Sequence, residues 1–316
     1  MPYLTPPKPS RLPGRLPDFL VIGTQKGGTS ALYRYLQQHP EVAVPREKEL
    51  NFFLDPGMLP DDPRGFERGA WHLGIDWYRR WHQTDRPVCG EASPNYSLGS
   101  HAEPVARRIA SVTPAARLIY LVRNPLERVR SHFRMFLKRP GAKALTFSEF
   151  LALPDTVSTS CYGAVVEAYL RHFPREQLLV LESSALDARR RESLAAIFRF
   201  LGVDDRFWCP QYERRVFVGS RRPFVSPLGA SIRDAAVVRI MRGRVPESLF
   251  YHIENMLLRP FGVPEPGVDL PPEQAAAVVT RLNADAKRLR ELTGQPLPSL
   301  DVTMEQAMSS TPAPRH

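Results

Sequence analysis

A glycine-rich loop with a single lysine is the first chemical feature of this 316-residue chain. Residues 23–30, GTQKGGTS, have the length of a Walker A loop, which binds phosphate in nucleotide triphosphatases. Thr29 stands where that loop has its lysine, and Lys26 lies in the middle instead. Glycines let backbone N–H groups close on phosphate oxygens, and a following helix adds its positive N-terminus. A lysine in mid-loop can then reach the oxygen between a phosphate and the group it loses. An ordinary tight turn is the alternative.

The residues after a neighbouring apolar run argue against a kinase or nucleotide triphosphatase. Those enzymes need Mg²⁺ ligands, usually an Asp at the end of such a strand. Here the run 117–122 ends in Arg123 and Asn124. The three cysteines are widely spaced, so they indicate neither a disulfide framework nor a zinc site. We therefore expect a site without metal, in which cations and backbone amides hold an anion.

The charge of the chain also indicates an anionic partner. Its net charge of +10 is compatible with a nucleotide, a nucleic acid, a membrane surface or an acidic substrate, and charge alone does not choose among them. Arginine supplies most of this charge and is spread along predicted helices, as on a solvated face. Lysine is rare, so a lysine inside an apolar-flanked motif indicates a chemical role. The lysines are Lys8, Lys26, Lys48, Lys138, Lys143 and Lys287.

The hydropathy of the chain favours a soluble protein. No stretch approaches the roughly 20 uninterrupted apolar residues of a membrane helix. Residues 1–17 carry Pro and Arg where a signal peptide would carry an apolar run. We expect a cytoplasmic protein with no membrane insertion.

Alternating apolar runs and helical patterns predict an α/β fold. Strands followed by helices favour a parallel sheet that is covered on both faces. Beyond residue 202 the pattern predicts further helices separated by turns containing Pro and Gly. We expect an N-terminal extension (1–17), one domain with a helical C-terminal part (18–308) and a tail (309–316). The predicted strands are 18–23, 88–91, 117–122 and 177–182, and the predicted helices are 31–38, 102–111, 125–138, 160–173, 188–201, 226–242, 246–258 and 271–293.

The glycine loop resembles the 5′-phosphosulfate loop of sulfotransferases that use 3′-phosphoadenosine 5′-phosphosulfate (PAPS), in particular the heparan-sulfate-type and related bacterial branch. The resemblance implies that Lys26 contacts the phosphosulfate and stabilises the leaving phosphate. Gly27, Gly28, Thr29 and Ser30 would supply the remaining phosphate contacts. It also implies a P-loop-like fold, with a central parallel sheet of about five strands flanked by helices.

A second motif lies about one hundred residues further on, at 123–133. An Arg that ends a strand, Arg123, is followed eight residues later by Ser131, which resembles the 3′-phosphate motif of the same family. Arginine offers a planar fork to phosphate oxygens, and a serine two turns along can reach the same group. A helix cap and a surface hydroxyl are the alternative for each residue alone. A weaker resemblance at 218–228 implies that Arg221 or Arg222 closes over the 3′-phosphate.

The segment 46–53, REKELNFF, resembles the Lys-Glu-x-x-Phe-Phe element of the family. It implies that Lys48 lies beside the acceptor and that Glu49 is the base that takes the acceptor proton. We expect Phe52 and Phe53 to line the site and to raise the proton affinity of the glutamate. Plain solvated charges are the alternative.

A further segment, 90–96, resembles the family pattern Glu-x-[Ser/Thr]-Pro-x-Tyr that borders the acceptor pocket. It makes Glu91 a second candidate base and places Ser93 beside the acceptor. Ala92 stands where the heparan-type enzymes commonly have lysine, so one cation on the acceptor side is missing. His101 is the third candidate base. The aromatic segment 71–82 either walls the acceptor pocket or packs into the core.

The resemblance therefore implies a PAPS-dependent sulfotransferase. Direct in-line transfer would move the sulfuryl group to a hydroxyl or amine of a small-molecule, lipid or carbohydrate acceptor, with no metal. Two alternatives stay open: a P-loop kinase or nucleotide triphosphatase that uses ATP–Mg²⁺, and a basic nucleic-acid-binding protein. We expect no nucleic-acid partner, and the sequence gives no oligomeric state.

Overall fold

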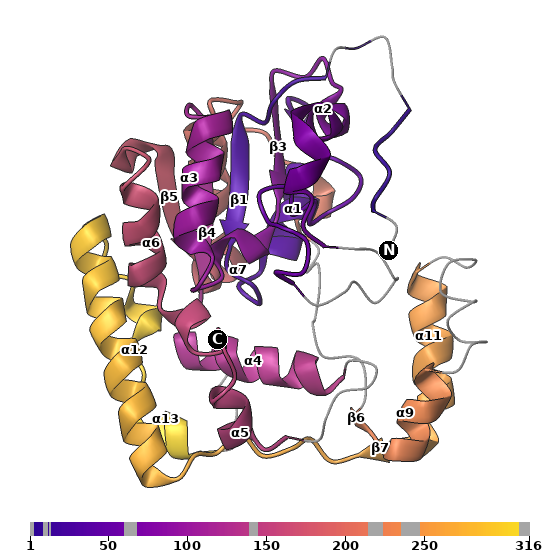
Figure 1. Cartoon of the computed structure of the whole chain (residues 1–316), viewed down its shortest axis with the longest axis vertical. Helices are drawn as coiled ribbons and strands as arrows, with labels where there is room; N and C mark the ends of the chain where they lie inside the picture. Colours follow the sequence, from indigo (N-terminus) through magenta and orange to yellow (C-terminus); the bar gives the residue numbers. More distant parts are fainter. Residues whose placement is uncertain are drawn as a thin grey trace.

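A five-stranded parallel sheet forms the centre of the computed structural model (Figure 1). The structure describes residues 3–8, 12, 14–59, 68–138, 145–213, 224–234 and 247–309. The strand order is β2-β3-β1-β4-β5, and every pairing is parallel. The predicted α/β fold is therefore confirmed. The strands are β1 (Phe19–Gly23), β2 (Val42–Ala43), β3 (Val88–Ala92), β4 (Arg117–Val122) and β5 (Leu178–Glu182).

The inner strands are apolar on both faces because helices cover the sheet on both sides. All five residues of β1 are buried, and so are all residues of β4 except Arg117. Leu20 and Ile22 point into one core cluster, while Phe19 and Val21 point into another. A continuous apolar run is typical of such a doubly covered strand. The sequence analysis did not predict β2, which has two residues and so is too short to show a periodic pattern.

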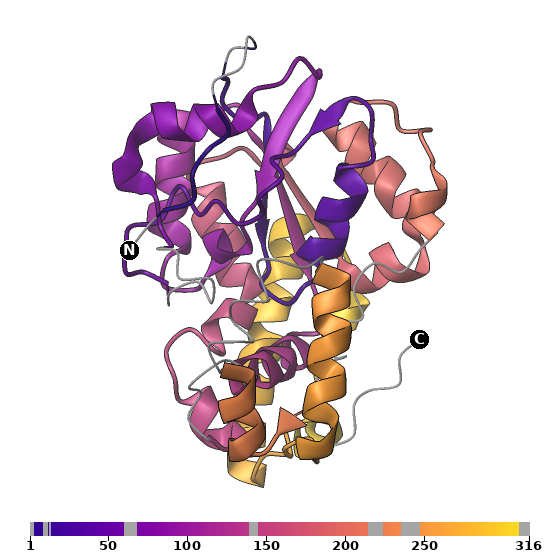
Figure 2. The ribbon, with the colours of Figure 1, turned by 90° about the vertical axis from the view of Figure 1, so that its right-hand side faces the viewer.

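Two helical layers pack on opposite faces of the sheet (Figures 1 and 2). One layer contains α3 (Ala102–Val112), α6 (Tyr162–Leu170) and α12 (Pro272–Thr293). The other contains α1 (Thr29–Leu36) and α8 (Arg190–Leu201). The remaining described α-helices are α2 (Gly74–Arg79), α4 (Pro125–Leu137), α5 (Phe147–Leu151), α7 (Ser183–Ala188), α9 (Pro227–Asp234), α11 (Glu247–Leu258) and α13 (Met304–Met308).

Helix α4 runs past the carboxyl ends of the strands and is held by the C-terminal part of the chain (Figure 1). Its apolar face packs with residues of α5, α12 and α13 in a third core cluster. The guanidinium of Arg130, which is 1% exposed, donates to the backbone oxygens of Val268 (3.3 Å), Gln306 (2.6 Å) and Ser309 (2.7 Å). Helices α12 and α13 and the segments that flank them therefore fix the position of α4.

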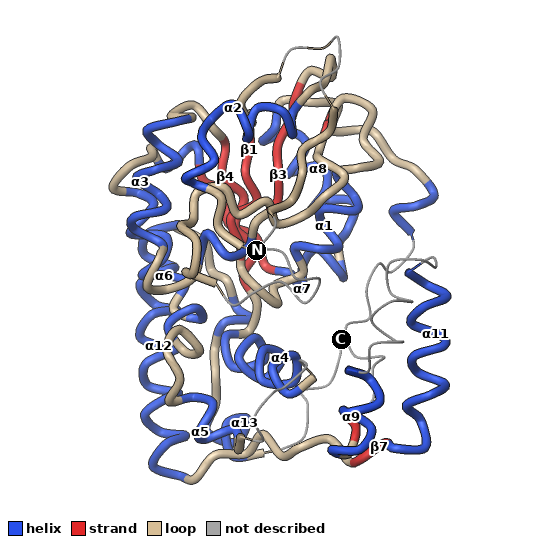
Figure 3. Tube along the Cα trace, turned by 45° about the vertical axis from the view of Figure 1, so that its right-hand side comes forward, coloured by secondary structure: helices blue, strands red, loops and turns tan. Residues whose placement is uncertain are grey.

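Helices α9 and α11 lie on the opposite side of α4 from α12 (Figures 1 and 3). They flank a short antiparallel pair, β6 (Phe224–Val225) and β7 (Gly262–Val263). The ammonium of Lys138, just after α4, lies 4.2 Å from the ring centre of Phe224. Arg134 and Glu265 form an ion pair between α4 and the segment after β7. None of the described helices is long and apolar enough to cross a membrane.

We expect Asn124→Ala to lower the free energy of unfolding more than an ordinary helix-cap substitution does. Asn124 caps α4 by accepting from Glu127 N–H (3.1 Å), and its amide donates to the carbonyls of Ser299 (3.1 Å) and Asp301 (3.2 Å). Loss of the cap and of both tertiary bonds should cost about 2 kcal/mol or more in urea unfolding. Thr146→Ala, which removes only the cap of α5, should cost about 1 kcal/mol. Equal losses would contradict the tertiary role of Asn124.

Candidate active site

The loop between β1 and α1 has the geometry of an anion cradle. Gly28 precedes α1 at φ 93°, a left-handed conformation that favours glycine. A Cβ on Gly27 would lie 2.9 Å from the Leu121 carbonyl, so the close approach of the loop to β4 requires glycine there. Helix α1 begins at Thr29. The N–H groups of Ala31 (2.9 Å) and Leu32 (3.2 Å) donate to the Gly28 carbonyl, and those of Thr29 and Ser30 precede the first hydrogen bond of the helix. Gly28 is exposed and Ser30 half-buried, so this helix end is open to a ligand.

Lys26 projects from this loop into a group of cations. Burial, together with repulsion from Arg123, Lys138, Lys48 and Arg128, lowers the pKa of Lys26 to about 8. Three of the six lysines in the chain therefore meet here. Such a concentration of like charge is stabilised by an anion.

Arg123 reaches the same region because of the order of the strands. Strands β1 and β4 are parallel neighbours, so the loop after β1 and Arg123 after β4 lie at the same edge of the sheet. The Arg123 side chain is 37% exposed and lies 3.7 Å from the Glu127 carboxylate, one turn along. Ser131 follows on α4 and is half-buried. The predicted Arg221 and Arg222 lie outside the described residues.

Glu49 lies next to the start of α1 and is held by two cations. Its Oε1 is 3.0 Å from Lys48 Nζ, and its Oε2 is 3.1 Å from Arg68 Nη2. Lys48 Nζ also donates to Thr29 Oγ1 (3.4 Å), which joins this ion pair to the anion cradle. The Glu49 side chain is 35% exposed. Arg68 is one of many arginines and no motif surrounds it, so the sequence does not indicate its role in the site.

The aromatic residues next to Glu49 belong to the hydrophobic core. Phe52 and Phe53 have no exposed surface. Phe52 stacks on Tyr78 with 4.1 Å between ring centres, and Phe53 meets Tyr96 edge to face at 5.5 Å. In this conformation neither ring is exposed to a ligand, so their burial does not support the expectation that they line the acceptor site. The aromatic segment 71–82 adopts the core alternative, since Tyr78, Trp81 and His82 are buried.

Glu91 and Ser93 are also fully buried. Oε1 of Glu91 accepts from the hydroxyls of Tyr78 (2.8 Å) and Tyr96 (2.7 Å), and Oε2 accepts from Ser93 (2.6 Å). Burial raises the pKa of Glu91, while these hydroxyls and a hydrogen bond from the Leu50 backbone act in the opposite direction. With 1% of its surface exposed, Glu91 cannot reach an acceptor in this conformation. Its predicted role as a base, and that of Ser93 beside the acceptor, do not fit this burial.

His101 precedes α3 in a loop that is tied to Asp155. The adjacent Ser100 donates to Asp155 through its backbone N–H (2.9 Å) and its hydroxyl (2.7 Å). Glu49 combines a half-buried carboxylate with a link to the cradle through one residue, because Lys48 Nζ contacts both Glu49 Oε1 and Thr29 Oγ1.

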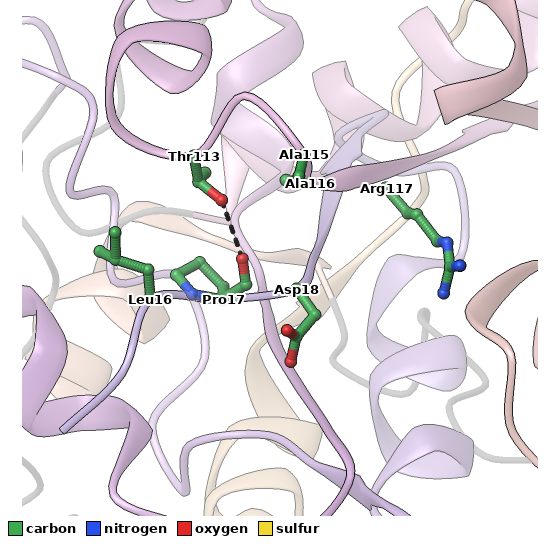
Figure 4. Close-up of a pocket in the computed structure, with 7 residues that line it drawn as sticks. All are labelled: Leu16, Pro17, Asp18, Thr113, Ala115, Ala116 and Arg117. Carbon is green, nitrogen blue, oxygen red and sulfur yellow. Dashed lines mark hydrogen bonds between the residues drawn. The ribbon is translucent and has the colours of Figure 1, made fainter. Parts of the chain in front are cut away.

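A surface hollow at the other end of the sheet is separate from this site (Figure 4). Its lining comes from the residues just before β1 and β4 and from Arg117, the first residue of β4. Thr113 Oγ1 donates there to the Pro17 carbonyl (3.1 Å). The predicted site residues are at the carboxyl ends, so we assign the chemistry to that edge.

Comparison with known proteins agrees with the loop motif. The family model described as "Sulfotransferase domain" matches residues 16–208, more than half of the chain. The human "Bifunctional heparan sulfate N-deacetylase/N-sulfotransferase 3" is 30% identical over 207 residues, which cover 60% of this chain and 22% of that protein. The human "Heparan sulfate glucosamine 3-O-sulfotransferase 6" is 30% identical over 199 residues, which cover 60% of this chain and 53% of that protein. The chain thus spans less than two thirds of either relative.

A solved structure shares the fold over most of the chain. The sulfotransferase from Alicyclobacillus acidocaldarius superposes with a TM-score of 0.59 and 23% identity, covering 90% of this chain and 98% of that one. The family that the motifs predicted is confirmed by the match over 16–208: this chain belongs to the sulfotransferase domain family.

Proposed function

We propose that this protein transfers a sulfuryl group from PAPS to a hydroxyl or amine of an acceptor. The observation that carries this proposal is the group of cations around Lys26, at the N-terminus of α1 and beside Glu49. An anion fits such a place, and a carboxylate next to it fits proton removal from an acceptor.

The donor would be held at both ends. Lys26 and the N–H groups at the start of α1 would bind the 5′-phosphosulfate, as P-loop amides bind phosphate. Arg123 and Ser131 would bind the 3′-phosphate, because the neighbouring β4 delivers them to the same edge. Arg221 and Arg222 stay predicted contacts to that phosphate.

The transfer step follows from these positions. The acceptor loses a proton to the Glu49 carboxylate, and its oxygen or nitrogen forms a bond to sulfur. The bond between sulfur and the bridging phosphate oxygen breaks, and that oxygen keeps the electron pair. Lys26 and the loop amides stabilise the added negative charge, an electrostatic effect that is large in a partly desolvated site. The product nucleotide is 3′-phosphoadenosine 5′-phosphate (PAP).

The use of Asn124 argues against a magnesium-dependent nucleotide triphosphatase. It stands after β4, where such an enzyme needs a metal ligand. Its side-chain oxygen accepts from Glu127 N–H, and its amide donates to two backbone carbonyls. Asn124 is therefore committed to capping α4.

We expect PAP to raise the melting temperature of the protein and ATP–Mg²⁺ to raise it much less. Lys26→Ala and Arg123→Ala should each weaken PAP binding by about ten- to hundredfold, because each removes a charge-assisted hydrogen bond. Lys287→Ala is the control, since it removes one exposed lysine charge on α12. Calorimetric titration measures the affinities. Stabilisation by ATP–Mg²⁺ alone, or normal PAP binding by Lys26→Ala, would overturn the proposal.

PAP affinity should depend on pH through Lys26. Its pKa is lowered to about 8, so between about pH 7, where the phosphates of PAP are still fully ionised, and pH 8 the ammonium is charged in both the free and bound protein and affinity stays nearly constant. Above it the free protein must take up a proton to bind, and affinity should fall about tenfold per pH unit. Lys26→Arg stays charged and should remove this dependence. A wild-type affinity that stays constant to pH 10 would contradict the assignment.

Glu49→Gln should stop transfer and keep PAP affinity, because the amide retains the shape of the carboxylate but cannot accept the proton. A positioned base contributes about a hundredfold or more to the rate. Radiolabelled PAPS with an acceptor identified from a cell extract measures transfer. Glu47→Gln removes a neighbouring carboxylate and should transfer at the wild-type rate. A Glu49→Gln variant with a near-normal rate would exclude Glu49 as the base.

A further inference from the structure

The buried Glu91 has no part in the transfer step described above, yet it organises hydrogen bonds next to it. It lies on β3, and its two oxygens accept three hydroxyl protons, from Tyr78, Tyr96 and Ser93. A buried carboxyl of this kind is stable only when it is hydrogen-bonded. The Ser93 and Tyr96 hydroxyls also contact the backbone of residues 46–53, at Asn51 and Phe53 respectively.

The Ser93 hydroxyl connects Glu91 to the segment that carries Glu49. A serine hydroxyl has one proton to donate and lone pairs that accept. The proton goes to Glu91 Oε2 (2.6 Å), so the hydroxyl oxygen presents a lone pair to the backbone N–H of Asn51 (3.0 Å). The carboxylate therefore sets the direction in which Ser93 accepts.

The segment around Glu49 needs such support because its backbone is unusual. Glu49 has φ 64° and Asn51 has φ 51°. Both values lie in the left-handed region of the backbone, which residues other than glycine rarely adopt. Hydrogen bonds from residues 49, 50 and 51 support this conformation. Glu49 N–H donates to Ala92 O (3.0 Å), Leu50 N–H donates to the Glu91 carboxylate, Asn51 N–H donates to Ser93 Oγ (3.0 Å) and Asn51 Nδ2 donates to Glu49 O (2.9 Å).

The same hydrogen bonds extend toward the cradle. Asn95 Nδ2 donates to Asn51 Oδ1 (3.0 Å), and Gln25 Nε2 donates to Asn95 Oδ1 (3.4 Å). Gln25 is the residue before Lys26. The end of β3 thus ties the Glu49 segment to the loop that carries Lys26.

We propose that Glu91 is a positioning residue: directly at the Leu50 N–H, and through Ser93 at the Asn51 N–H, it fixes the backbone of the Glu49 segment relative to the anion cradle. The effect on transfer rests on the proposed function, in which Glu49 is the base. The structural part stands apart from it, since the Asn51 N–H bond exists whatever the chemistry. A displacement of reacting groups by about 1 Å costs about a hundredfold in rate, so the position of this backbone matters.

Ser93→Ala and Tyr78→Phe form a matched pair. Each removes one buried hydroxyl from Glu91, but only Ser93→Ala removes the acceptor of the Asn51 N–H. Glu91→Gln tests the carboxylate itself. The side-chain oxygen of the glutamine should keep accepting from the two tyrosine hydroxyls. The amide NH₂ group then faces Ser93. The Ser93 proton must then turn away from residue 91, toward Asn51.

Hydrogen exchange of residues 46–53, followed by mass spectrometry, is the first measurement. Ser93→Ala and Glu91→Gln should speed exchange there by about tenfold, the loss of one hydrogen bond, whereas Tyr78→Phe should not. Calorimetric titration should give unchanged PAP affinity in all three variants. Transfer should fall at least about tenfold in Ser93→Ala and Glu91→Gln only.

Several outcomes would overturn the proposal. Exchange of 46–53 in the wild-type protein as fast as in an exposed loop would show that Asn51 is not held. Tyr78→Phe and Ser93→Ala could also change exchange and transfer equally, at equal loss of melting temperature. That result would show that Glu91 contributes to core stability in general and does not position the Glu49 segment. Faster exchange in Ser93→Ala with an unchanged transfer rate would contradict the positioning role. Absence of PAP binding in the wild-type protein would refute the proposed function and leave the exchange result standing.

Discussion

Repulsion among cations at the carboxyl edge of the sheet is the constraint on which the site depends. Lys26 is partly desolvated and lies near Arg123, Lys48 and Lys138. Desolvation and repulsion destabilise its charged form, and this lowers its pKa to about 8. The protein keeps this arrangement because β1, β4 and α1 are fixed by two apolar clusters, one on each face of the sheet. The core thus holds these cations close together despite their mutual repulsion. A bound anion would reduce that repulsion.

The fold could be predicted because its signals are local. Apolar runs gave four of the five strands, and the glycines at 27 and 28 marked a loop whose conformation admits little else. The lysine displaced to position 26 then indicated the family. The division into an extension, one domain and a tail, the cytoplasmic location and the roles of the individual site residues stay predictions.

Burial was the part of the site that the sequence could not supply. Glu91 and Phe53 lie in motifs, but their exposure depends on the packing of residues 71–82 against them, a tertiary contact that no spacing reveals. Arg68 came to Glu49 from a segment without a motif. In both cases the sequence shows the type of side chain but not the residues that lie next to it in the fold. Motifs therefore predicted which residues gather at this edge better than they predicted which of them face a ligand.

Helix α4 depends on the C-terminal part of the chain through backbone atoms. Arg130 donates to carbonyls of residues 268, 306 and 309, and every amino acid supplies the same carbonyl. These three bonds therefore depend on the path of the main chain and not on the side chains that carry the carbonyls. The side chains have other tasks, since Val268 is buried in the third core cluster and Gln306 completes the capping box of α13.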